Sequence, residues 1–172
     1  MTQSSDAPAS LLQKIALPVV LLTVGPQDAL KTIVTTVSYV SLAPLRIAQS
    51  FPAVSETAKM MLARARFSVS IAAYEQLDLV KSLSNSGLLA RVIGERDGLA
   101  KFPGDEELYY FAHSLLAFDC QVEKSFRSDD YLVIVSLVRG CQKGDGLKPL
   151  VRFGHGYAAV DDTIFSDDSY PV

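Results

Sequence analysis

Runs of apolar and β-branched residues alternate with short turn-forming segments in the first third of the chain. Residues 19–24 form the first run and predict a strand, which a turn over residues 25–28 would end. Residues 32–42 are dense in Thr, Val, Ile and Tyr and predict a second strand. Pro44 ends that strand, and residues 46–51 predict a third.

The spacing of apolar residues becomes helical in the middle of the chain. Ser55 is a favourable N-cap, and residues 55–66 are rich in helix formers. Residues 67–72 alternate apolar and small polar positions as a strand does. Residues 75–83 place Leu77, Val80 and Leu83 on one side of a second helix. Glycines and prolines over residues 84–107 predict a loop with short helical pieces.

Strand-like runs return towards the end of the chain. Residues 115–124, 131–141 and 150–160 predict three strands, and a glycine-rich link over residues 140–146 joins the last two. A short helix over residues 11–16, stopped by Pro18, would precede the first strand. With about seven strands at the two ends and the helices between them, the chain is expected to be mainly β with α insertions. This order favours a barrel over repeated βαβ units.

The chain has 172 residues, which suits a single domain over residues 1–172, with an ordered core over about residues 9–160 and peripheral tails. Apolar residues make up 49% and charged residues 20%, which is a globular composition. The net charge of −3 argues against nucleic-acid binding.

No apolar run approaches the length of a membrane helix, and the first ten residues lack Lys and Arg, so no leader is expected. These features predict a cytoplasmic protein with no membrane partner. The two cysteines and two histidines show no metal-binding spacing, so no metal is expected.

Four segments of the chain resemble, in order and spacing, the flavin-reductase-like FMN-binding split barrels. They are residues 33–42 followed by Pro44, residues 55–57 leading into the strand at 66–71, residues 116–122, and residues 149–153 followed by Tyr157. The resemblance implies a split β-barrel that binds FMN, with FAD as the alternative. It also implies reduction of flavin by NADH or NADPH, delivery of reduced flavin to a partner monooxygenase, and a homodimer with flavin near the subunit boundary.

The resemblance also assigns site residues, and it implies no catalytic acid or base. It places flavin-ring contacts at Thr35, Thr36, Val37 and Ser38, phosphate contacts at Ser55 and Thr57, backbone contacts at Ser70, Ile71 and Ala72, and substrate contacts at His155 and Tyr157. In a continuous strand Thr36 and Ser38 would share one face, and Thr35 and Val37 the other.

Each of these residues also has a purely structural interpretation. Thr and Val are common in any sheet, and Ser55 would serve as an N-cap in any helix. Glu56 would repel a phosphate at that helix end unless Lys59, Arg64 or Lys81 offset its charge. A lone histidine such as His155 is most often a surface or hydrogen-bonded structural residue.

One departure from the family pattern keeps a second hypothesis open. Family members often carry Gly-Asp-His before the penultimate strand, where this chain has Ser128, Asp129 and Asp130. The family links that histidine to nicotinamide binding, so Asp130 favours an FMN-binding protein or partner subunit without reductase activity. A third hypothesis is a β-barrel that binds no flavin. An absorbance spectrum with added FMN and nicotinamide cofactor separates the three.

Overall fold

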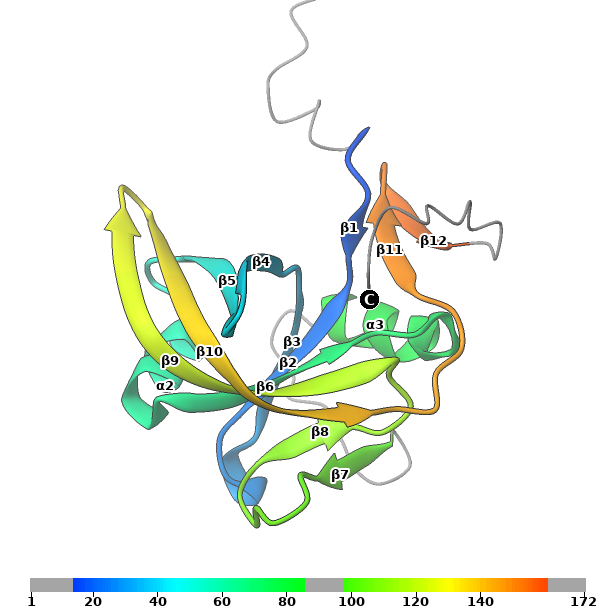
Figure 1. Cartoon of the computed structure of the whole chain (residues 1–172). Helices are drawn as coiled ribbons and strands as arrows, with labels where there is room; N and C mark the ends of the chain where they lie inside the picture. Colours follow the sequence, from blue (N-terminus) through cyan, green and yellow to red (C-terminus); the bar gives the residue numbers. More distant parts are fainter. Residues whose placement is uncertain (1–13, 86–97, 161–172) are drawn as a thin grey trace, which may run out of the picture.

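A seven-stranded antiparallel sheet forms the body of the computed structural model, which describes residues 14–85 and 98–160 (Figure 1). The strand order is β3-β2-β6-β9-β10-β5-β4. The bounds are β2 (Val20–Val24), β3 (Lys31–Thr35), β4 (Ser38–Leu42), β5 (Leu45–Pro52), β6 (Arg66–Ile71), β9 (Leu116–Ser128) and β10 (Tyr131–Lys143). The sheet curls strongly, but β3 and β4 remain its two edges, so it is a split barrel.

Two small sheets and two helices complete the fold. One sheet contains β1 (Leu17–Pro18), β11 (Leu150–Phe153) and β12 (Gly156–Ala159), and the other pairs β7 (Leu99–Lys101) with β8 (Tyr109–Phe111). The helices are α2 (Glu56–Arg64) and α3 (Leu77–Asn85), with short 3-10 turns η2 (Gln27–Ala29) and η3 (Tyr74–Gln76). Figure 1 shows α3 near the sheet of β11 and β12, and the long β9–β10 hairpin curving away on the opposite side.

Strand β2 is buried along its whole length because it packs on both faces. Val20, Leu22 and Val24 point into the barrel, where Phe67 and Ile134 join the same apolar cluster. Val19 and Leu21 point the other way, into a cluster that includes residues of α3. A strand covered on both faces needs apolar residues at nearly every position, which explains the unbroken run that predicted it.

The predicted helices are confirmed with small changes in their ends. The Ser55 hydroxyl accepts a hydrogen bond from the Ala58 amide at 3.3 Å, so Ser55 is the N-cap of α2. Helix α2 ends at Arg64, because Ala65 adopts a left-handed conformation with φ of 56°. Leu77 and Leu83 pack with Val80 against the α3-side cluster, as their spacing predicted.

Several strand predictions were wrong in detail. Residues 32–42 form two strands, because pairing ends after Thr35 and resumes at Ser38 with a different partner. Residues 150–160 form the β11–β12 hairpin, turned at Gly154 with φ of +62°. The described residues contain twelve strands instead of about seven.

The remaining differences lie in the loops and links. β7 and β8 were missed within and beside the expected loop, since three-residue strands carry little pattern. The glycine-rich link begins later than expected, because Gly140 still pairs within β10. The helix expected over residues 11–16 lies largely outside the described residues.

None of the helices in residues 14–85 and 98–160 has the length and apolar character of a membrane span.

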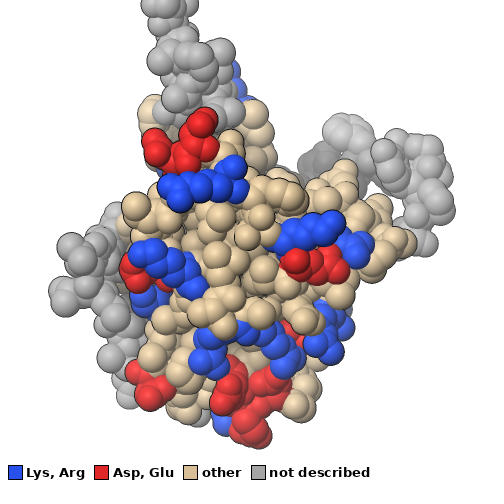
Figure 2. Space-filling view, turned by 90° about the vertical axis from the view of Figure 1, so that its left-hand side faces the viewer, with Lys and Arg blue, Asp and Glu red and all other residues tan. Residues whose placement is uncertain are grey.

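Charges on the face shown in Figure 2 are mixed: Lys and Arg side chains lie directly beside Asp and Glu, without a broad area of one sign. The face in this view therefore shows no basic patch of the kind that nucleic-acid binders present.

Ser136 provides a test of barrel packing. Its hydroxyl is fully buried on β10 and finds no hydrogen-bond partner within the described part of the chain. We expect Ser136→Ala to raise the free energy of unfolding by about 1 kcal/mol, because an unsatisfied buried hydroxyl is destabilising. Denaturant titration measures the change.

The matched control for this variant is Ser114→Ala. The Ser114 hydroxyl is equally buried but donates to the Phe111 carbonyl at 2.5 Å. Its removal is expected to lower the free energy of unfolding by about 1 kcal/mol. A loss of stability in both variants would show that the Ser136 hydroxyl has a partner after all.

The two cysteines are expected to differ in reactivity. Burial, and secondarily the charge of Asp119, raises the pKa of Cys120 well above its ordinary value. Cys141 is exposed, and partial desolvation raises its pKa as well. Because only the thiolate reacts, alkylation of Cys141 should increase with pH over a range more alkaline than that of a free thiol. Cys120 should be alkylated only after unfolding, and mass spectrometry of peptides labelled with and without denaturant checks both outcomes.

Candidate functional site

Two cavities lie at opposite ends of β2. The first, of about 310 Å³, lies beside Val24 and Gly25 and is also lined by Arg64, Arg66 and Tyr109. The second, of about 580 Å³, lies beside Val19 at the start of the strand. The charges that line them distinguish the two.

The charges in the first cavity are paired with one another. Arg66 pairs with Asp105 and donates to Asp119 at 2.8 Å, and that hydrogen bond raises the pKa of Arg66. Arg64 donates to Glu107 at 2.9 Å. These ion pairs join α2 and β6 to the loop before β8, and β6 to β9. This cavity is therefore best explained as part of the scaffold.

The second cavity is built where β3, α3 and the β11–β12 hairpin meet. Its lining residues are Val19, Val34, Thr35, Thr36, Lys81, Ser84, Arg152, His155, Gly156 and Tyr157. The Ser84 hydroxyl and the Tyr157 hydroxyl share a hydrogen bond at 3.0 Å, which ties α3 to β12 beside the cavity. We call this space the β3 cavity.

Backbone hydrogen bonds fix the wall behind the β3 cavity. The Val19 amide donates to the Leu150 carbonyl at 3.1 Å, and the Ala72 amide donates to the Val19 carbonyl at 2.9 Å. The Leu150 amide in turn donates to the Ala72 carbonyl at 3.0 Å. These bonds join β11 and the end of β6 to the start of β2, so the hairpin that carries Arg152 and Tyr157 is held against the main sheet.

Positive charge in the β3 cavity is not paired with a carboxylate of the described residues. Among the residues described, neither Lys81 nor Arg152 forms an ion pair, and the cavity lining contains no carboxylate. His155 adds an imidazole ring to the same lining. The cavity therefore combines hydroxyl groups, an apolar wall of Val19 and Val34, and cations that are available to an anion.

Four of the eleven predicted site residues come together in the β3 cavity: Thr35, Thr36, His155 and Tyr157. Thr35 and Thr36 both line it because β3 ends at Thr35, so the alternation expected for a continuous strand does not apply. Val37 packs against the barrel core instead, and Ser38 is exposed at the start of β4.

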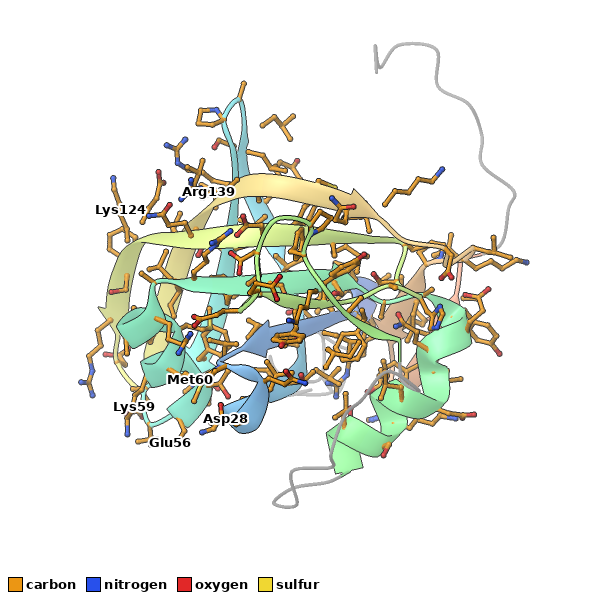
Figure 3. The ribbon with its side chains drawn as sticks, turned by 90° about the horizontal axis from the view of Figure 1, so that it is seen from below. Asp28, Glu56, Lys59, Met60, Lys124 and Arg139 are labelled. Atoms are coloured by element: carbon orange, nitrogen blue, oxygen red, sulfur yellow. The ribbon has the colours of Figure 1, made fainter. Side chains whose placement is uncertain are left out.

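The predicted phosphate residues lie outside the lining of the β3 cavity. Thr57 is buried in α2, and the Ser55 hydroxyl is occupied as the helix N-cap. Glu56 pairs with Lys59 at 2.6 Å, and that hydrogen bond lowers the pKa of Glu56. Figure 3 shows Glu56, Lys59 and Asp28 gathered at one end of the molecule, away from α3.

The predicted backbone contacts on β6 lie behind the cavity wall. Ser70 is fully buried, and its hydroxyl accepts a hydrogen bond from the Phe111 amide at 3.1 Å. Ala72 is also fully buried, while Ile71 packs against the barrel core. Ala72 reaches the lining only through its hydrogen bond to Val19.

Sequence reasoning did not assign Lys81, Ser84 and Arg152 to the site. Lys81 was considered only as an offset to Glu56, which Lys59 pairs with instead. Lys81 and Ser84 are three positions apart on α3, so they are neighbours on the helix surface. That spacing was a usable signal that the two side chains lie close together. Arg152 carried no signal, because only the hairpin turn decides where it lies.

Comparison with known proteins identifies the family. The family model described as "Flavin reductase like domain" matches residues 12–161. No curated protein sequence matches the chain. Among solved structures, the styrene monooxygenase flavin reductase of Pseudomonas putida is 15% identical, with 91% of this chain and 99% of that chain covered and a TM-score of 0.76.

Two further solved structures share the fold. BorF, the flavin reductase component of a bacterial two-component tryptophan halogenase, is 19% identical, with 92% and 99% of the two chains covered and a TM-score of 0.78. An NADH:FAD oxidoreductase of Streptomyces globisporus, solved with NAD and FAD fragments, is 13% identical, with 90% and 92% covered and a TM-score of 0.75. Because the family model matches most of the length of this chain, the chain belongs to the flavin reductase-like domain family and is an oxidoreductase of that class.

Proposed function

We propose that this chain is an NAD(P)H-dependent flavin reductase that binds FMN at the β3 cavity. The observation that carries the proposal is the convergence of Thr35 and Thr36 with Lys81 and Arg152 in one cavity of about 580 Å³. Cavities that hold small cofactors usually have volumes in this range. The family assignment supports the reaction class.

The donors present match the chemical demands of a flavin nucleotide. The ring system has a polar edge that takes hydrogen bonds, which the hydroxyls of Thr35 and Thr36 can supply. Its faces are apolar, and Val19 and Val34 offer apolar contacts. Its phosphate is a dianion, and the lining contains two cations that have no acidic partner among the described residues.

The protein has a positioning role in this reaction. When bound, flavin and nicotinamide would supply the hydride-transfer chemistry, so the chain would need no acid–base pair. The chain orients the rings through Thr35 and Thr36, excludes water with Val19 and Val34, and neutralises phosphate charge with Lys81 and Arg152. The hydrogen bond between Ser84 and Tyr157 holds the two sides of the cavity together.

The choice of cofactors and partner rests on the comparisons as well as on the cavity. FMN is the proposed flavin, and FAD is the alternative because one similar structure contains FAD fragments together with NAD. Similar structures are reductase components of a styrene monooxygenase and of a two-component tryptophan halogenase. We therefore propose that reduced flavin passes to a partner monooxygenase, and that both proteins act in the cytoplasm.

Asp130 supports the second candidate function, an FMN-binding protein or subunit without nicotinamide-dependent turnover. It lies at the tip of the β9–β10 hairpin, where its carbonyl accepts a hydrogen bond from the Ala53 amide at 2.7 Å. The thirteen residues of β10 separate this tip from the β3 cavity, which explains why Asp130 is absent from the lining within one chain. A carboxylate near bound nicotinamide would repel its phosphates.

A homodimer is the proposed assembly, with the apolar β4–β9 surface as the interface. Val40 and Phe126 are 52% and 54% exposed and line a hollow of about 550 Å³ that also includes Arg46 and Glu123. Tyr39 and Leu42 on the same edge strand are 74% and 75% exposed. Apolar residues gathered along an edge strand favour pairing with a second copy.

The proposed function predicts that the purified protein binds FMN and oxidises NADH or NADPH when flavin is supplied. Replacing both cavity threonines with valine (Thr35→Val and Thr36→Val) should weaken FMN binding about tenfold or more, since two hydrogen bonds to the ring edge are lost. Fluorescence quenching measures the affinity, and loss of absorbance at 340 nm measures turnover.

Thr32→Val is the control, because Thr32 also lies on β3 but its hydroxyl is bonded to Thr23 at 3.1 Å, away from the cavity. It should leave FMN affinity unchanged. Bound flavin that NADH and NADPH both fail to bleach would support the second candidate. Failure to bind FMN or FAD would contradict both candidates.

The dimer predicts a doubled mass by analytical ultracentrifugation. Leu42→Lys combined with Phe126→Lys should shift the protein to the monomer mass, because each change places a charge in the apolar interface. Leu147→Lys changes a residue that is 80% exposed on the β10–β11 link and should leave the dimer intact. A monomeric parent protein would rule out this interface.

A further inference from the structure

Arg152 and Tyr157 are direct partners in the β11–β12 hairpin. Side chains of opposite residues in an antiparallel pair lie on the same face of the sheet. The Tyr157 hydroxyl is hydrogen-bonded to Ser84 of α3, so this face of the hairpin is the one turned towards α3. The register thus brings Arg152 to the side from which Lys81 approaches.

The packing of α3 determines where Lys81 lies. Leu79 and Val80 are held in the apolar cluster with Leu21 and Leu150, which fixes the rotation of α3. Lys81 and Ser84 then lie along the exposed face of the helix at the edge of the β3 cavity. Two cations from elements about seventy residues apart in sequence therefore meet at one cavity, together with His155.

What distinguishes Lys81 and Arg152 from other cations of the described residues is that the two line one cavity. Arg46, Lys59, Arg64, Arg66 and Lys101 each pair with a carboxylate. Lys81 and Arg152 share a cavity without any acidic group in its described lining. Two like charges held near each other favour an anion between them.

We infer that Lys81 and Arg152 form a phosphate clamp for a nucleotide cofactor, with His155 at its edge. This inference rests on the proposed function and locates the phosphate site at α3 and β11 instead of at the N-terminus of α2. At the latter site the Ser55 hydroxyl is already used as a cap, and Glu56 adds negative charge. The clamp binds a phosphate group, which is either the 5′-phosphate of FMN or a phosphate of the nicotinamide cofactor.

The test compares ligands that differ only in phosphate. Dissociation constants for FMN and riboflavin, and KM values for NADPH and NADH with saturating riboflavin, are measured for the parent, Lys81→Gln, Arg152→Gln and the double variant. Loss of each cation should weaken binding of the clamped phosphate about tenfold. Both side chains are exposed, so the variants should keep the parent melting temperature.

The two phosphate sources give different results. A clamp for the flavin weakens FMN binding and leaves riboflavin binding unchanged. A clamp for the nicotinamide cofactor raises the KM of NADPH or NADH at constant kcat and leaves FMN binding unchanged. Equal effects on FMN and riboflavin, or no effect on any ligand, would overturn the inference. Arg152→Lys keeps the charge and should restore most of the lost affinity.

Lys101→Gln is the matched control. It removes the same charge from an exposed lysine on β7, whose pairing with Tyr109 places it towards the other end of β2. It should leave every affinity unchanged. Binding of inorganic pyrophosphate, measured by calorimetry, separates the inference from the proposed function: a protein that binds pyrophosphate through Lys81 and Arg152 but reduces no flavin retains the clamp and refutes the reductase.

Discussion

The packing of β2 on both of its faces is the constraint on which the rest of the structure depends. One face contributes Val20, Leu22 and Val24 to the barrel interior, and the other contributes Leu21, together with Val19 just before the strand, to the layer beneath α3. Burial of apolar surface on two sides makes this short strand the element that joins the barrel to its surroundings. Both cavities lie at its ends because its middle leaves no free surface.

The proposed site arises where that packing stops. β3 follows β2 only as far as Thr35, and the chain leaves the sheet before β4 begins on the opposite edge. The opening between the two edges is the split in the barrel, and Thr35 and Thr36 lie beside it. The α3 helix and the β11–β12 hairpin approach the same place, so the site takes its polar groups from segments that are distant in sequence.

The charged side chains at the two ends of β2 differ in whether they form ion pairs. At the Val24 end, Arg66 bridges Asp105 and Asp119, and the groups satisfy one another. At the Val19 end, Lys81 and Arg152 have no such partner in the described lining, and a cavity of their own opens between them. Paired ions of the first kind add specificity to the scaffold, whereas unpaired cations keep their attraction for an anionic ligand.

Local patterns were sufficient to predict the elements that depend on near neighbours. The apolar run of β2, the Ser55 cap and the Leu77, Val80 and Leu83 stripe were all visible, because each follows from one strand or one helix turn. The order of segments was sufficient for the family. Residues 32–42 were misjudged as one strand because a break in pairing leaves no mark in a run of β-formers.

Tertiary structure alone decided which side chains share a site. The sequence by itself determined a mainly β protein, and its resemblance to the family named eleven site residues, of which Thr35, Thr36, His155 and Tyr157 line the β3 cavity. Only the folded chain brought Lys81 and Arg152 to the same cavity, because their positions depend on the rotation of α3 and the register of the β11–β12 hairpin. Both are set by long-range packing, which no local periodicity encodes.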